Sequence, residues 1–179
     1  MVNRLPLDLP GIEEEFLRIE VRRSTRRKKT ISAEIVGDAL LVSIPDRLSR
    51  AEEQEWVRHM AARMAERKRR DRLNSEGSLE SRAAALADEY LGGIRPESIS
   101  WVATQKTRWG SCSIDDRTIR ISQAIADYPG WVRDYVIVHE LAHLLVPDHS
   151  ERFWAFAERY PLTERARGFL IAKGMEEGE

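Results

Sequence analysis

Two histidines and a glutamate have the spacing of a catalytic zinc site. They lie in the sequence His139-Glu140-Leu141-Ala142-His143. On an α-helix, residues four apart lie on one face, so His139 and His143 can bind one metal ion. Glu140 is rotated by about 100° from His139, so it can reach a water on that ion without binding the ion. Zinc held by three protein groups lowers the pKa of a bound water to about 7, and a nearby carboxylate can take the proton while the water attacks a carbonyl. The motif therefore predicts a zinc site with hydrolytic chemistry.

The surrounding sequence favours a metal site over a chance pair of histidines on a helix. Residues 131–146 are almost wholly apolar after Asp134, which indicates a buried helix, and sixteen residues are too few for a comfortable membrane span. Burying two imidazoles and a carboxylate is costly unless something pairs with them, and a metal ion does so. Three of the four histidines in the chain lie in this stretch or just after it.

The third ligand is predicted to be His149. Pro147 cannot continue a helix and disfavours helical backbone at Val146, so the helix should end near there and the chain can turn back. That turn would bring His149 beside the two helical imidazoles. The alternative is a glutamate on a later helix, where the possible residues are Glu151, Glu158 and Glu164.

Composition limits the class of protein. A chain of 179 residues is one domain, or one domain with a small extension, and its net charge of −1 excludes a polycation. The one cysteine, Cys112, excludes an internal disulfide and Cys-rich zinc modules. The N-terminus lacks the apolar core of a signal peptide, and no run reaches membrane length. A cytoplasmic protein with no membrane partner is expected.

Period-two patterns in the first 45 residues predict three strands. Apolar residues alternate with other residues in 17–22, and again in 31–35 and 40–44 on either side of Gly37-Asp38. Two strands separated by such a pair form a tight hairpin. The three segments are expected to form a three-stranded antiparallel sheet.

A run of cations follows the first predicted strand, and we call this segment the basic hairpin. Clustered Lys and Arg can bind phosphates by releasing counterions. However, no aromatic residue lies among them to stack on bases, and charged loops also protect sheet edges. Nucleic-acid binding is therefore possible but is not favoured over a solvated loop. The cations are Arg22, Arg23, Arg26, Arg27, Lys28 and Lys29.

The sequence from Ser49 to Glu52 is a capping box and begins a helix. Trp56, Met60 and Met64 on this helix have the spacing of a packing stripe. His59 lies far from the zinc motif in the sequence and is expected at the surface.

Turn-forming residues at 74–78 predict a boundary between an N-terminal extension, residues 1–73, and a second domain, residues 74–179. The elements expected in the second domain are, in order, a helix at 79–90, strands at 98–105 and 117–122 paired across Asp115-Asp116, the histidine-bearing helix, and helices at 150–160 and 163–173.

Four segments together resemble the YgjP-like metallopeptidases, relatives of the SprT-like and WLM zinc proteases within the zincin group. They are the basic hairpin through Pro45, the loop Arg108-Trp109-Gly110-Ser111-Cys112, the core from Tyr135 to Leu144, and His149-Ser150 with Phe153-Trp154. The resemblance implies an α+β fold, in which the antiparallel sheet of a zincin-like catalytic domain packs on the active-site helix behind a small N-terminal sheet extension. It also implies His139, His143 and His149 as zinc ligands and Glu140 as the catalytic base.

The segment Arg108-Trp109-Gly110-Ser111 is predicted to bind substrate. A peptide can bind a zincin by adding a strand to an edge of this kind. Trp109 is expected to pack in the core and Gly110 to provide a bend, so binding would come from the backbone. Cys112 could bind the metal as a thiolate, although a lone cysteine beside a strand is more often a buried small residue.

Other residues near the motif are expected to support it. Phe153 and Trp154 should pin the loop that carries the third ligand. The candidates for stabilising the tetrahedral oxyanion are Arg108, Lys106 and Tyr128.

The function predicted from these features is that of a zinc-dependent metallopeptidase acting on proteins or peptides. The alternative enzyme is a hydrolase of a nucleotide phosphoanhydride, with Arg108 and the basic hairpin holding the phosphates. A third possibility is a non-catalytic module with structural zinc that binds nucleic acid. Glu140 argues against this third possibility, because a structural site has no use for a base beside it.

Overall fold

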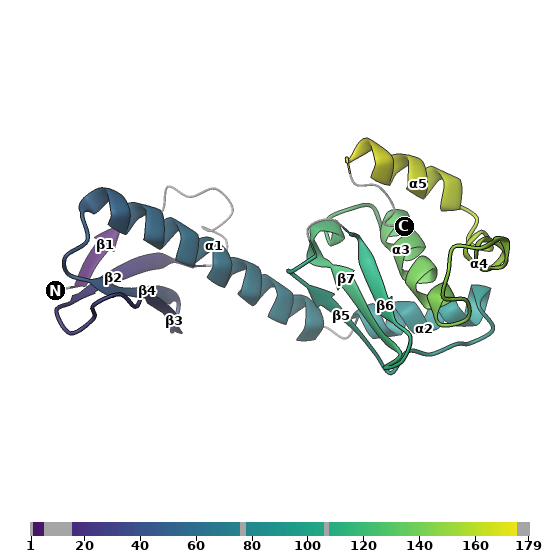
Figure 1. Ribbon diagram of the computed structural model, residues 1–179, viewed down its shortest axis with the longest axis horizontal. Helices are drawn as coiled ribbons and strands as arrows, with labels where there is room; N and C mark the ends of the chain where they lie inside the picture. Colours follow the sequence, from purple (N-terminus) through teal and green to yellow (C-terminus); the bar gives the residue numbers. More distant parts are fainter. Residues whose placement is uncertain (1, 6–15, 76–77, 106–107, 175–179) are drawn as a thin grey trace. The chain divides into compact units, whose positions relative to one another are not determined.

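The computed structural model describes residues 2–5, 16–75, 78–105 and 108–174 (Figure 1). The chain falls into two units, residues 1–69 and residues 70–179, with the boundary inside the long helix α1 (Arg50–Ser75). The division at residues 73 and 74 into an extension and a catalytic domain stays a prediction.

The first unit contains a four-stranded sheet in the order β1-β2-β4-β3. Its strands are β1 (Val2–Leu5), β2 (Arg18–Ser24), β3 (Ser32–Val36) and β4 (Ala39–Pro45). The predicted hairpin between β3 and β4 is confirmed, with Gly37 at φ +63° in its turn.

The prediction of three antiparallel strands was wrong in two respects. β1 adds a fourth strand, and β2 pairs with β4 in parallel. Period two shows that a segment is a strand but does not choose its neighbour. The useful signal was the nearly continuous apolar sequence of β4, which is buried along its whole length and therefore suits the centre of the sheet.

Helix α1 covers this sheet with small side chains. The capping box is present, because Glu52 accepts from Ser49 N at 2.8 Å. The predicted packing stripe was wrong for Trp56, which is 42% exposed, but Met60 and Met64 are partly buried and pack against the core. The fully buried face lies one position on and is formed by Val57, Ala61 and Ala65. Small residues let the helix lie close to the sheet, and this close approach outweighs the greater hydrophobicity of the larger residues. His59 is exposed, as predicted.

The second unit contains a mixed three-stranded sheet in the order β5-β7-β6. Its strands are β5 (Ser98–Val102), β6 (Gly110–Ser113) and β7 (Thr118–Ser122). The predicted pairing of the outer two segments across Asp115-Asp116 was wrong. The strand that pairs antiparallel with β7 across that turn is β6, while β5 pairs with β7 in parallel. β6 is short and polar, so it has no hydrophobic alternation, and it lies at an edge of the sheet.

Helix α3 (Gly130–His143) occupies the centre of the second unit and contacts β6, β7 and three helices (Figure 1). Its buried residues include Val132, Tyr135, Val138 and Leu141, so its apolar sequence is explained by burial on several sides. Within the described residues, no helix combines the length and apolar character needed to cross a membrane. The other helical elements are α2 (Ser78–Tyr90), η1 (Gln123–Ile125), α4 (Glu151–Ala157) and α5 (Thr163–Ala172).

Candidate metal centre

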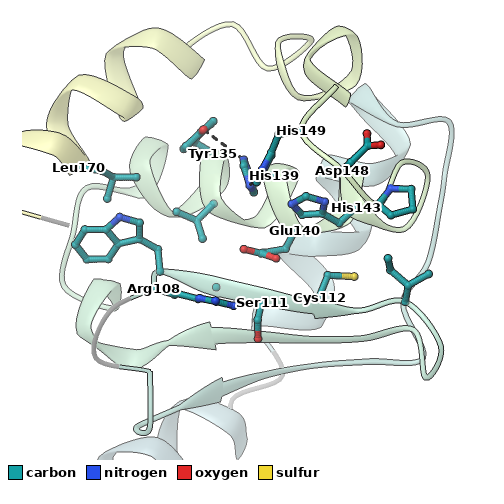
Figure 2. Close-up of a pocket in the computed structure, with 15 residues that line it drawn as sticks. Arg108, Ser111, Cys112, Tyr135, His139, Glu140, His143, Asp148, His149 and Leu170 are labelled. Atoms are coloured by element: carbon teal, nitrogen blue, oxygen red, sulfur yellow. Dashed lines mark hydrogen bonds between the residues drawn. The ribbon is translucent and has the colours of Figure 1, made fainter. Parts of the chain in front are cut away.

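The three predicted histidine ligands come together in the structure. His139 and His143 lie one turn apart on α3, and His149 returns toward them from the loop before α4. Their candidate ligand atoms all lie within 4.8 Å of one another, and the Nε2 atoms of His139 and His149 are 3.1 Å apart. Figure 2 shows the three imidazoles on one side of the Glu140 carboxylate.

The other ring nitrogens of the helical histidines face protein groups. His143 Nδ1 lies 3.2 Å from the carbonyl oxygen of Val146, which can only accept, so Nδ1 carries the proton and Nε2 keeps its lone pair. His139 Nδ1 lies 3.4 Å from the hydroxyl of Tyr135, one turn earlier on α3 (Figure 2). These contacts orient the rings toward a common point.

Aromatic residues of α4 pack directly against the histidine rings. Phe153 is fully buried, and its ring centroid lies 4.4–4.8 Å from those of all three histidines. Trp154 stacks on His149 at a centroid distance of 5.8 Å and an angle of 25°. The predicted packing role of Phe153 and Trp154 thus extends beyond the loop to the whole histidine cluster.

Burial keeps the helical imidazoles neutral. It lowers the pKa of His139 to about 3, with further contributions from the charges of His143 and His149. Burial also lowers the pKa of His143. A neutral imidazole has the lone pair that a metal ion requires, so both side chains are ready to bind without first losing a proton.

The arrangement fits a zinc ion. Two ligands at about 2.0–2.1 Å from a tetrahedral zinc have nitrogens roughly 3.3 Å apart, close to the 3.1 Å between His139 and His149. Three nitrogen donors also leave the fourth position for water or substrate, as in catalytic zinc sites.

Glu140 lies beside this cluster and is buried, with 6% of its surface exposed. Burial raises the pKa of its carboxyl group to about 8, an effect that the positive charge of Arg108 partly opposes. The carboxyl group is directed toward β6, because a side-chain atom added at Gly110 would lie 2.7 Å from Glu140 Cδ. Glu140 is thus placed next to the proposed metal without being one of the grouped ligands.

A cleft of about 390 Å³ contains the histidines, Glu140 and the predicted substrate segment. Arg108 is exposed at the cleft, whereas Trp109 is 5% exposed and packs on Tyr128 at 5.7 Å between ring centroids. The side chain of Ser111 accepts from Gln105 Nε2 at 2.5 Å. The edge strand predicted for this segment is present from Gly110 onward as β6.

The structure also bears on the remaining candidates for oxyanion stabilisation and for metal binding. Tyr128 packs on Trp109 and Phe169 and is not among the residues that line the cleft, while Lys106 lies outside the described residues. Cys112 lines the cleft, and burial raises the pKa of its thiol to about 11, which disfavours the thiolate. None of the three candidate glutamates, Glu151, Glu158 and Glu164, belongs to the histidine group found among the described residues.

Sequence reasoning missed some of the cleft walls. Tyr135 has a detectable signal, because it lies four residues before His139 and so on the same face of the helix. Leu170 lies on α5 and has no local signal, since only the tertiary fold brings it to the cleft. The other wall residues that were not singled out are Ile114 and Val136.

Comparison with known proteins relates the chain to one family and one solved structure. The family model described as YgjP-like, metallopeptidase domain, matches residues 47–170, more than half of the chain. Among solved structures, the chain is similar to the metallopeptidase zymogen abylysin of Pyrococcus abyssi, with a TM-score of 0.50 and 24% identity. That likeness covers 56% of this chain and 99% of abylysin, and it concerns the fold. No curated protein matches. The predicted α+β, zincin-like fold is confirmed, apart from the sheet details corrected above.

Proposed function

This chain belongs to the YgjP-like metallopeptidase family, and from this premise we propose that it hydrolyses peptide bonds with a zinc ion held by His139, His143 and His149. Membership makes it a metal-dependent peptidase, a hydrolase that acts on proteins or peptides. The observation that carries the proposal is the meeting of three imidazoles and one buried carboxylate in a single cleft. Imidazole nitrogen suits zinc among the common metals, and three such ligands match its catalytic sites.

Glu140 acts as the general base in this proposal. Zinc, when bound, lowers the pKa of a water molecule and polarises the substrate carbonyl. The Glu140 carboxylate accepts a proton from the attacking water and delivers it to the nitrogen of the leaving amine. Burial raises the pKa of this carboxyl group to about 8 in the metal-free protein, and the positive charge of a bound metal ion would favour the carboxylate that the first step requires.

The edge of β6 and Arg108 provide the substrate contacts. A peptide that adds to the free edge of β6 would place its backbone beside Glu140 (Figure 2). Arg108 is close enough to lower the pKa of Glu140, and its guanidinium is available to stabilise the negative charge that develops on the carbonyl oxygen. We therefore assign Arg108 to oxyanion stabilisation and the free edge of β6, which begins at Gly110, to peptide binding, while the carbonyl oxygen of Trp109 accepts from Ser122 N within the sheet.

The test measures bound metal and hydrolysis on the same preparation. Peptide mixtures, an unfolded protein and nucleoside triphosphates are offered to the protein as isolated, after chelation, and after zinc is returned. We expect peptide cleavage that chelation abolishes and that about one equivalent of zinc restores. Triphosphate hydrolysis without peptide cleavage would replace this proposal with the phosphoanhydride hydrolase. Peptide cleavage that continues unchanged after chelation would exclude zinc from the proposed mechanism.

A further inference from the structure

Gly110 lies where β6 passes closest to Glu140. It is buried, and it stands opposite Ile121 of β7 in the sheet register. A Cβ atom at this position would lie 2.7 Å from both Cδ and Cγ of Glu140 and would also meet Oε1. Real Cβ atoms essentially never approach other heavy atoms within 3.0 Å. The strand therefore approaches the carboxylate so closely that only a hydrogen atom fits between them.

This contact, and not the backbone conformation, requires glycine at position 110. Glycines with φ in the left-handed region occur at the turns and helix ends of this chain, as at Gly37 and Gly92, but Gly110 is not one of them. Its extended backbone in β6 would suit any residue. The glycine at position 110 is therefore explained by the close approach of a functional side chain, and not by the bend that was predicted.

We propose that Gly110 is a positioning residue, which holds the Glu140 carboxylate against β6 in the place where it serves as general base. This inference rests on the function proposed above. A glutamate side chain has three rotatable bonds, and the backbone at Gly110 closes off one side of the space that they could sweep. Figure 2 shows the carboxylate confined between α3 and the β6 segment, with His143 beside it.

The size of the expected effect follows from the distances. To restore an ordinary contact of 3.4 Å or more with Oε1, the nearest atom, Glu140 or the strand must move by roughly 1 Å. A general base must lie within about 2.6–3.2 Å of its proton partner, and a misplacement of about 1 Å can cost on the order of 100-fold in rate. A displacement of this size does not require the histidines to move.

The first experiment adds one methyl group with Gly110→Ala. We expect kcat to fall roughly 10- to 100-fold while zinc content and zinc affinity stay unchanged. The matched control is Gly168→Ala, because a Cβ there meets nothing within 4 Å. That control should keep wild-type activity. Loss of zinc in Gly110→Ala, or equal loss of activity in both variants, would overturn the proposal.

A double-mutant cycle with Glu140→Asp tests the contact itself. Aspartate is one methylene shorter, so its carboxylate lies farther from β6 and leaves room for the added methyl group. In zinc-free protein, Gly110→Ala should lower Tm by roughly 3–8 °C, and the same substitution in the Glu140→Asp background should lower it by much less. Likewise, Gly110→Ala should reduce the residual activity of Glu140→Asp by less than about 3-fold.

The two readouts separate this inference from the proposed function. Equal effects of Gly110→Ala in both backgrounds would show that position 110 acts through something other than Glu140, and the inference fails while the peptidase stands. A wild-type protein that cleaves no peptide under any metal condition overturns the proposed function, whatever the melting temperatures show.

Discussion

The histidine cluster of the second unit and the basic hairpin of the first unit are both dense in polar groups, yet their surroundings differ. The cluster lies among apolar residues, and burial shifts the pKa values of His139 and Glu140 far from their ordinary values. The hairpin cations Arg26, Lys28 and Lys29 are exposed. Water satisfies an exposed cation at little cost, whereas buried polar groups need a partner. Burial is thus what marks the cluster as a site.

One cation of the basic hairpin, Arg23, differs from the exposed cations because it bonds to protein groups. Arg23 donates from Nε to the buried carboxylate of Glu53 at 2.8 Å and from Nη1 to the carbonyl oxygens of Asp46 and Leu48. It therefore joins the hairpin to the start of α1 and has a structural role. The basic run combines one cation that the fold uses with others that face solvent.

The largest expected effect comes from Glu140→Gln. The amide keeps nearly the same shape but cannot accept a proton, so turnover should fall by roughly 10²–10⁴-fold. Zinc content should stay the same, because Glu140 is not among the grouped ligands. The measurement is metal content and kcat on one preparation. Full activity in this variant would remove Glu140 from the mechanism.

The next effect is on the stability of zinc-free protein at different pH values. The pKa of Glu140 is raised from 4.5 to about 8 by folding, so the native state holds a proton that the unfolded state has released between these values. Taken alone, Glu140 makes stability fall by at most about 4 kcal/mol as pH rises from 4.5 to 8, and this fall is unopposed only above about pH 6.5, where the histidines are neutral in both states. Glu140→Gln should remove the fall, and denaturant unfolding at pH 7 and pH 9 measures it.

His139 gives the opposite dependence at lower pH. Its pKa is lowered by folding from 6.5 to about 3, so the unfolded state binds the proton first and stability falls as pH drops through this window. Zinc-free protein should consequently be most stable between about pH 4.5 and 6.5. Replacement of an exposed carboxylate, Glu151→Gln, serves as the control and should leave the pH dependence unchanged. A wild-type protein equally stable at pH 7 and pH 9 would contradict the burial of Glu140.

The third effect distinguishes histidine from glutamate as the third ligand. His149→Ala should weaken zinc binding by roughly 10²–10³-fold, if each ligand contributes a comparable share of the binding energy. Glu158→Ala should leave zinc affinity almost unchanged, since that side chain is exposed and outside the histidine group. Competition with a chelator of known affinity measures both. Retained zinc in the histidine variant together with lost zinc in the glutamate variant would assign the site to the glutamate type.

The local parts of the site could be predicted from the sequence. The spacing of His139 and His143 places them on one face of a helix, and Pro147 ends that helix so that the chain can return with His149. Such inferences depend on a few neighbouring residues, whose geometry the backbone fixes.

Features that depend on distant segments could not be predicted in the same way. The parallel pairing of β2 with β4, the place of β6 at the sheet edge and the arrival of Leu170 at the cleft all depend on tertiary packing. The contact of Gly110 with Glu140 belongs to this group as well. A glycine in a strand suggests either a bend or a close approach, and only the fold decides between them.

The smallest effect is expected at the basic hairpin. Replacing Arg26, Arg27, Lys28 and Lys29 with glutamine should leave peptide hydrolysis and zinc affinity unchanged, because these residues lie outside the cleft-forming unit. Binding to duplex DNA at physiological salt should be weak or undetectable both before and after the change, since no aromatic residue accompanies the cations.

The control is Arg23→Gln, which should bind nucleic acid no differently but should destabilise the first unit, because it breaks the bonds to Glu53, Asp46 and Leu48. A tight complex whose affinity falls steeply with salt, and whose salt dependence flattens in the four-residue variant, would show that the exposed cations form a second functional surface. In that case burial would no longer suffice to separate the functional polar groups of this chain from the merely solvated ones.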